Sequence, residues 1–101
     1  MFKIVWLVMM ITEVYVKVFG RVQGVFFRQS TKSEAERWGV CGWVKNCDDG
    51  TVEALLQGDS ESIQRMLDWI QHGPDRAKVE NVNVIFEKSC TNSLEAFTIL
   101  Y

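Results

Sequence analysis

A short segment, GRVQGVFFR at residues 20–28, has the composition of an anion-binding loop. It follows an apolar alternating stretch and directly precedes a helical pattern. The first amides of a helix have no intrahelical partner and lie at the positive end of its dipole. Arg28 adds a bidentate donor at a place where a positive charge is normally unfavourable unless an anion binds. The segment therefore predicts a site for a phosphate group.

Two elements flank this segment. Residues 14–19 alternate between apolar and mixed side chains, which predicts a strand that ends at Gly20. Gly20 and Gly24 allow positive φ in the connection that follows. Helix-forming residues then occupy 28–38, and Gly39 stands where a helix C-terminus favours a left-handed residue. One face of this helix would carry Phe27, Thr31, Ala35 and Trp38.

The rest of the chain repeats the alternation of strands and a helix. Residues 41–45 and 51–56 predict two strands joined by a tight Asp-Gly turn at residues 47–50. Asp59 suits the N-cap of a second helix that stops at Gly73-Pro74. Two further strands are expected, one around residues 79–86 with an irregularity near Asn81, and a short one at 97–101. The apolar face of the second helix would carry Ile63, Met66, Leu67 and Ile70.

This order of elements, βαββαβ with a short extra last strand, predicts an α+β fold of the ferredoxin-like split βαβ type. Both helices should lie on one face of an antiparallel sheet, with the other face partly solvated. The first strand-to-helix loop and the strand that begins near Cys41 would then lie close together. Arg28 and Asn46 are therefore expected within reach of one ligand.

Length and composition indicate a single domain and argue against a nucleic-acid partner. The chain has 101 residues, of which 48% are hydrophobic and 24% charged, enough for one domain with one core. A net charge of -2 argues against a broad nucleic-acid surface. The same topology serves RNA-binding modules, and Tyr15, Phe19 and Trp43 could imitate their stacking aromatics, but the acidic balance and the missing RNP pattern oppose that function.

Three cysteines are too few and too scattered for a disulfide framework, and no spacing typical of a metal site occurs. We expect reduced thiols and a cytoplasmic protein. A bridge between Cys41 and Cys47 stays open at this point, because both lie near one predicted hairpin and the sequence does not give their separation.

The N-terminal run IVWLVMMI at residues 4–11 is apolar but much shorter than the roughly 20 residues that cross a bilayer. A signal peptide is a minor alternative, because the run lacks the small-residue cleavage site that such a peptide carries. We expect residues 1–11 to form an apolar extension that lengthens the first strand. The domain itself would then occupy residues 12–101.

Two segments, GRVQGVFFR at 20–28 and GWVKNCDDGTVEALLQG at 42–58, give the chain a specific family likeness. The chain resembles an acylphosphatase from about Val14 to Tyr101. The resemblance implies hydrolysis of an acyl phosphate to a carboxylate and inorganic phosphate, without metal or organic cofactor. It also implies a phosphate-binding role for Arg28 and a water-positioning role for Asn46. Phosphate oxygens would be bound by the backbone amides of Gln23, Gly24, Val25, Phe26 and Phe27.

A site without a metal, a cofactor or a general acid is sufficient for this reaction. Phosphoryl transfer needs positioning and electrostatic stabilisation more than proton shuttling. A carboxylate leaving group, whose acid has a pKa of about 4, departs at neutral pH without a general acid. Asn46 is not a base, but its carboxamide can orient a water. Proton removal could fall to a phosphate oxygen of the substrate.

The alternative to an enzyme is a binding or regulatory domain that holds phosphate or carbamoyl phosphate without hydrolysing it. Turnover of a small acyl phosphate by the isolated chain would distinguish it from an enzyme. A Walker-type nucleotide loop is excluded, because Gly20 and Gly24 are too close and no Gly-Lys-Ser/Thr follows. The expected ligands are a small acyl phosphate and phosphate or sulfate anions, and the expected state is a monomer.

Overall fold

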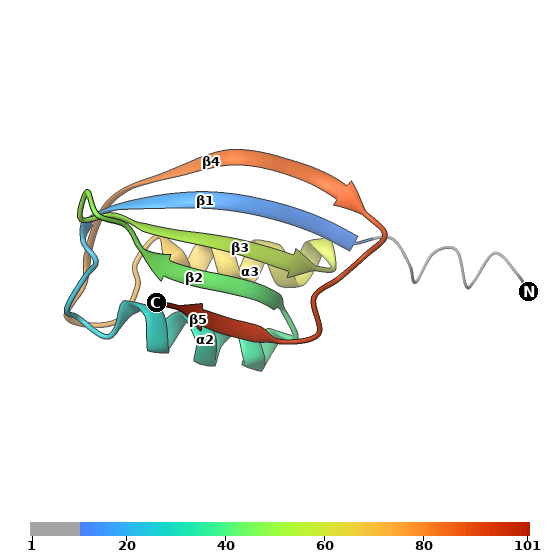
Figure 1. Cartoon of the computed structure of the whole chain (residues 1–101), viewed down its shortest axis with the longest axis horizontal. Coiled ribbons are helices and arrows are strands. Elements are labelled where there is room, and N and C mark those ends of the chain that lie inside the picture. The colour runs from blue at the N-terminus through green and yellow to red at the C-terminus, as the bar shows by residue number, and fades with distance from the viewer. Residues whose placement is uncertain (1–10) are drawn as a thin grey trace, which may run out of the picture.

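Five strands and two helices follow one another in the order that the sequence pattern predicts (Figure 1). The computed structural model describes residues 11–101. The expectation that the residues before Ile11 extend the first strand lies outside this range. The elements are β1 (Ile11–Arg21), α2 (Phe27–Trp38), β2 (Cys41–Asn46), β3 (Val52–Gly58), α3 (Ser60–Ile70), β4 (Lys78–Cys90) and β5 (Phe97–Leu100).

The sheet has the strand order β4-β1-β3-β2-β5. The pairs β4–β1, β1–β3 and β3–β2 are antiparallel, whereas β5 runs parallel to β2. The ferredoxin-like prediction is therefore confirmed, but the sheet is mixed rather than wholly antiparallel. The cause lies in the path of the chain: after β4 it crosses the end of the sheet and enters the far edge beside the start of β2 (Figure 1).

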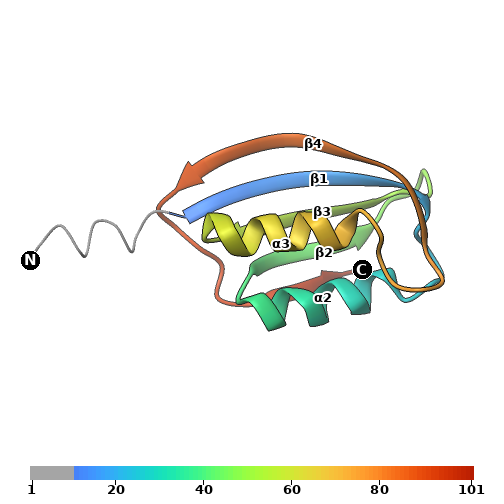
Figure 2. The ribbon, with the colours of Figure 1, turned by 180° about the vertical axis from the view of Figure 1, so that it is seen from behind.

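Both helices cover one face of the sheet, as expected (Figure 2). The alternation in β1 sends Val14, Val16 and Val18 into the layer between sheet and helices, where none of them is exposed. The helices contribute their apolar faces to the same core. Its helical members are Phe27, Thr31, Ala35, Ile63, Met66 and Ile70.

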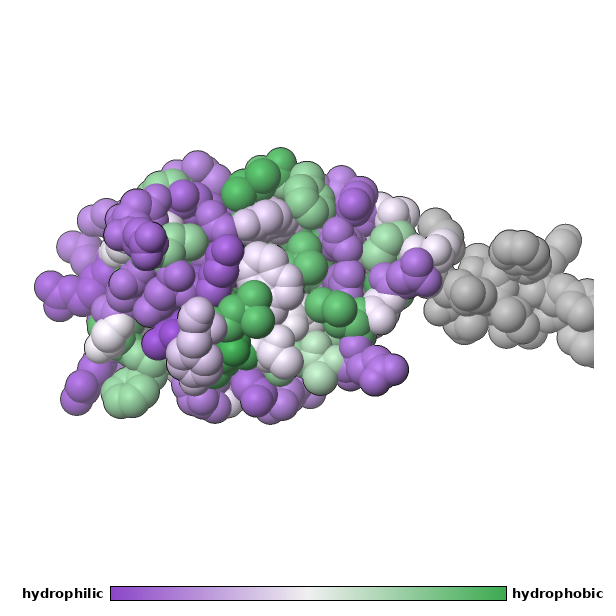
Figure 3. All heavy atoms as spheres, viewed as in Figure 1, coloured by the Kyte–Doolittle hydropathy of each residue, from purple (hydrophilic) through white to green (hydrophobic). Residues whose placement is uncertain are grey.

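The opposite face of the sheet is open to solvent. The ring of Tyr15 contacts the rings of Trp43 and Phe86 edge to face, each at 5.6 Å between centroids. Figure 3 shows apolar side chains gathered over the middle of this face, with hydrophilic ones toward the hairpin end. Trp43 therefore packs on the open face of the sheet with Tyr15.

Several boundaries differ from the sequence expectation. Strand β1 is longer than residues 14–19 and runs from Ile11 to Arg21. The irregularity expected near Asn81 is present, because the register between β1 and β4 shifts at Phe19/Gly20. A second shift occurs at Tyr15/Val16.

The three cysteines are free. Cys41 is the first residue of β2 and Cys47 directly follows its last, so the length of the strand separates them by about 20 Å. A bridge between them is therefore geometrically impossible, which resolves the alternative left open by the sequence. Separately, none of the helices within residues 11–101 has the length and apolar character needed to cross a membrane.

Candidate active site

The loop between β1 and α2 is shaped by two glycines with positive φ, 123° at Gly20 and 74° at Gly24. At Gly20 the backbone passes very close to β4. A Cβ atom there would lie 2.1 Å from the carbonyl oxygen of Lys78, so no larger residue fits without moving β4. Gly24 has open space around it, and its conformation alone favours glycine.

Buried side chains hold the loop against the body of the protein. Val22, Val25 and Phe27 all point into the core. The ring of Phe27 also packs against Trp69 of α3, with 5.9 Å between centroids. Because these anchors are buried, the core holds the backbone between them in position.

Gln23 ties the loop to the β2–β3 hairpin. Its side-chain amide donates to the carbonyl oxygens of Cys47 at 2.8 Å and Thr51 at 2.9 Å. These two carbonyls flank the turn that directly follows Asn46. One carboxamide thus fixes the position of Asn46 relative to the loop that precedes Arg28.

Asn46 is the last residue of β2, and strand alternation decides where its side chain points. Asn46 shares a face with the buried Gly42 and Val44, whereas Lys45 lies on the open face with its ammonium 5.4 Å from the ring centroid of Trp43. The Oδ1 atom of Asn46 is buried and has no hydrogen-bond partner among the described residues. A buried acceptor in this condition is costly unless a ligand or water supplies a donor.

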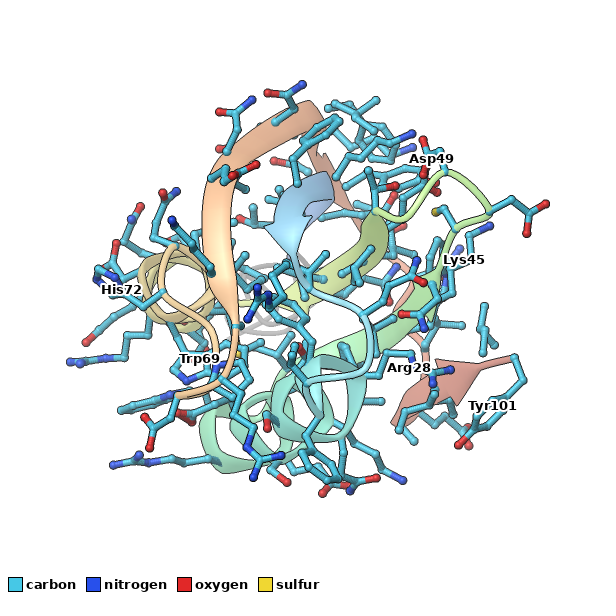
Figure 4. The ribbon with its side chains drawn as sticks, turned by 90° about the vertical axis from the view of Figure 1, so that its left-hand side faces the viewer. Arg28, Lys45, Asp49, Trp69, His72 and Tyr101 are labelled. Atoms are coloured by element: carbon cyan, nitrogen blue, oxygen red, sulfur yellow. The ribbon has the colours of Figure 1, made fainter. Side chains whose placement is uncertain are left out.

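Arg28 lies in the first turn of α2 and is half-buried. Within residues 11–101 no carboxylate forms an ion pair with it. Its guanidinium carbon lies 5.1 Å from the ring centroid of Tyr101, which follows β5. Figure 4 shows Arg28 and Tyr101 at one corner of the molecule, with His72 on the opposite side beyond α3. The positive charge of Arg28 is therefore oriented by stacking and remains available to an anion.

These groups surround a cavity of about 290 Å³, near the lower end of the range for small-molecule sites. The loop, the start of α2, the end of β2 and the region of β5 each contribute to its wall. The residues that line it are Val22, Gly24, Phe26, Phe27, Arg28, Gln29, Asn46, Ile99 and Tyr101.

The hairpin that carries Asn46 is held by charged and hydroxyl groups. The Asp49 carboxylate accepts hydrogen bonds from the hydroxyl and backbone N–H of Thr51 and forms an ion pair with Lys17 at 2.9 Å. The Thr51 hydroxyl and Lys17 hold the pKa of Asp49 well below its usual range. Nearby, the Tyr15 hydroxyl donates to Glu53, which raises the pKa of Tyr15 to about 12.

The structure brings together Arg28 and Asn46, as the topology predicted. Of the expected loop residues, Gly24, Phe26 and Phe27 line the cavity. The other two lie outside the lining: Val25 is buried beneath the loop, and the Gln23 side chain faces the hairpin.

Sequence reasoning missed three contributors. It considered only the backbone of Gln23, although the side chain of Gln23 fixes the hairpin. It gave no role to Gln29 or to Tyr101. Helical position could have identified Gln29, which lies one residue after Arg28 in the first turn. Tyr101 had no local signal, because its place depends on which sheet edge β5 joins.

Comparison with known proteins identifies the family of the chain. The family model for acylphosphatase matches residues 14–99. An acylphosphatase from Paraburkholderia xenovorans is 52% identical over 69 residues, covering 68% of this chain and 71% of that protein. One from Syntrophus aciditrophicus is 44% identical over 92 residues, covering 91% and 95%.

A solved structure extends the likeness to three dimensions. The crystal structure of an acylphosphatase from Bacillus subtilis superposes with a TM-score of 0.80 at 38% identity, covering 89% of this chain and 99% of that chain. The enzyme interpretation is therefore favoured over a domain that only binds phosphate. The chain belongs to the acylphosphatase family and is a hydrolase of acyl phosphates.

Proposed function

We propose that the enzyme binds the phosphoryl group of an acyl phosphate with the backbone amides of residues 23–27 and the guanidinium of Arg28. Three features support this role for the loop: positive φ at Gly24, buried anchors beneath it, and the unpaired N-terminus of α2 beside it. The same donors would bind inorganic phosphate or sulfate. As the bond to the leaving group lengthens, they stabilise the charge spread over the equatorial oxygens.

Asn46 positions the attacking water. The observation that carries this assignment is its buried Oδ1 atom, which has no partner among residues 11–101 although Asn46 lines the cavity with Arg28. A water that donates to Oδ1 would satisfy this acceptor and would be fixed relative to the phosphoryl group. The Gln23 bonds to the hairpin keep that relation constant.

The reaction balances without a protein base. The water oxygen forms a bond to phosphorus, and the phosphorus–oxygen bond to the acyl group breaks, with its electron pair leaving on the carboxylate. The proton of the water passes to a phosphate oxygen. Because the acid of the leaving group has a pKa of about 4, the carboxylate departs without protonation.

The test is hydrolysis of benzoyl phosphate by the purified chain in EDTA, compared with Asn46→Ala. We expect turnover by the wild type and a loss of about 10²-fold or more in kcat for the variant, because the water loses its orientation. Asn83→Ala is the matched control, since Asn83 is an exposed asparagine on β4 whose carboxamide accepts only from Asn81. Circular dichroism establishes that both variants fold.

The outcomes separate the parts of this proposal. Full activity in folded Asn46→Ala would refute the water-positioning role and leave the phosphate site standing. An equal loss in Asn83→Ala would mean that the effect is not specific to the cavity.

We also infer a monomer in the cytoplasm. Among residues 11–101, Arg28, Asn46 and the loop before α2 line one cavity, so the proposed site needs no residue from a second copy. The three free thiols suit a reducing compartment. Sedimentation equilibrium would test the monomer, and a mass matching two chains at assay concentration would refute it.

A further inference from the structure

Phe26 combines an unusual backbone conformation with an exposed aromatic ring. It has φ of 63° and ψ of 23°, and it is the single non-glycine residue with positive φ within residues 11–101. For a bulky side chain this left-handed conformation is strained. A glycine or asparagine would adopt it more easily.

Core packing does not explain the aromatic ring. The side chain of Phe26 is 69% exposed, whereas its neighbours Val25 and Phe27 are buried. An exposed ring on a strained backbone gains little stability from its surroundings. The ring nevertheless lines the cavity next to Arg28.

The cavity lining combines two kinds of chemical group. Gly24, Arg28 and Asn46 present the donors and the acceptor that suit the phosphate and the water. The lining also includes the side chains of Phe26, Ile99 and Tyr101, which are apolar or aromatic. Of these, the Tyr101 ring lies against the Arg28 guanidinium. In an acyl phosphate the acyl group is joined directly to the phosphate, so an acyl group held in this cavity would contact the apolar and aromatic side chains of its lining.

The charge of the cavity lining further limits which acyl groups the site would accept. Arg28 is the single charged side chain among the described residues that line the cavity. Once it pairs with the phosphate, no second cation of the lining is left for an anionic acyl group. Lys45, the residue before Asn46, is directed to the open face of the sheet and toward Glu53.

We propose that the ring of Phe26 is a specificity-determining surface on which the acyl group packs, so that the enzyme prefers acyl phosphates with a flat, uncharged acyl group. This inference rests on the proposed phosphate site. Ring-to-ring packing contributes enough to change the relative affinity for two acyl groups several-fold. The left-handed conformation leaves the ring of Phe26 exposed at the cavity, whereas Val25 and Phe27 on either side are buried.

The experiment measures kcat/KM for benzoyl phosphate and acetyl phosphate, and follows their ratio. In Phe26→Asn, which removes the ring but tolerates positive φ, the benzoyl-to-acetyl ratio should fall about fivefold, mainly through KM for benzoyl phosphate. Phe26→Tyr should keep the ratio. A third substrate, 4-carboxybenzoyl phosphate, should be used several-fold less well than benzoyl phosphate by the wild type.

Leu94→Asn is the matched control, because Leu94 is an exposed apolar residue outside the cavity. Its ratio should equal that of the wild type. An unchanged ratio in folded Phe26→Asn, or equal losses on both substrates, would overturn the role of the ring. By contrast, absence of turnover on every substrate by the wild type would refute the proposed function itself, so the two failures are distinguishable.

Discussion

The two helices pack on the same face of the sheet, yet they begin in opposite ways. At α3 the Asp59 carboxylate accepts from the backbone N–H of Ser62 at 2.9 Å, and Glu61 stands in the first turn. At α2 the N-cap position is Phe26, which has no acceptor in its side chain. The first turn of α2 holds Arg28 and no acidic residue.

This difference shows how one fold uses the same helix end for two purposes. The N-terminus of α3 is satisfied by its own sequence, which stabilises the helix. The N-terminus of α2 keeps its positive potential and adds a guanidinium to it. A protein optimised only for stability would cap both helices, so the unpaired end of α2 fits a ligand that carries the negative charge.

The largest effect is expected from removing Arg28, the positive charge that distinguishes the start of α2 from the start of α3. Arg28→Ala should lower kcat/KM for benzoyl phosphate by about 10³-fold, because it removes the cationic donor for the equatorial phosphate oxygens. Arg65→Ala in α3 is the matched control: its guanidinium pairs with Glu61 on the exposed surface at 3.3 Å. Steady-state kinetics should give wild-type values for the control. Comparable losses in both variants would abolish the distinction between the two helices.

A smaller effect should follow from giving α2 the acidic first turn that α3 has. Gln29 lines the cavity and is exposed, so Gln29→Glu places a carboxylate beside the phosphate site with almost no change in shape. We expect kcat/KM to fall about fivefold at low ionic strength, since one like charge at short range in water contributes about 1 kcal/mol. In 1 M salt the difference should shrink.

Glu61→Gln in α3 is the reciprocal change. It should lower the free energy of unfolding by about 0.3–0.5 kcal/mol and leave the kinetics unaltered. Unchanged kinetics in Gln29→Glu at low salt would contradict an anion site at the start of α2.

The sequence predicted the difference between the helices because the signals are local. Asp59 and Glu61 are typical of a capped start, and Arg28 after a glycine-bracketed loop is typical of an anion site. The alternation of residues 14–19 likewise predicted a strand with one face on the core, and Val14 and Val16 are buried there.

What the sequence did not predict depends on contacts between distant segments. The four residues of β5 carry no local signal for the edge that they join or for their direction, so Tyr101 could not be placed beside Arg28. The bonds from Gln23 to Cys47 and Thr51 span more than twenty residues. The left-handed conformation of Phe26 has no signal at all, because phenylalanine rarely adopts it.

A third prediction concerns stability alone. Asp59→Ala should lower the free energy of unfolding by about 1 kcal/mol, because the backbone N–H of Ser62 loses its acceptor, and it should leave activity unchanged. Urea denaturation measures the loss, and Asp59→Asn should restore part of it. Wild-type stability in Asp59→Ala would mean that the cap is dispensable.

The pH dependence of this cap has a definite sign. The backbone N–H of Ser62 lowers the pKa of Asp59 in the folded state. The charged form is therefore favoured by folding, so the extra stability is present above the unfolded pKa of about 4 and is lost as pH falls through the lower folded value. The stability difference between wild type and Asp59→Ala should shrink across that acidic range.

The last prediction is that kcat shows no inflection from an enzyme group between about pH 5 and 8. Arginine stays charged throughout this range and asparagine has no titratable group, so a site built on Arg28 and Asn46 leaves the protein nothing to titrate. The sequence has one histidine, His72, which lies across the molecule from Arg28 (Figure 4). His72→Asn should therefore have the wild-type profile. If the folded wild type has a bell-shaped kcat profile and His72→Asn does not, the catalytic centre lies near His72 and not at the start of α2. A bell that persists would require a proton-transferring group in the cavity, and the two helix ends would then differ by more than their charge.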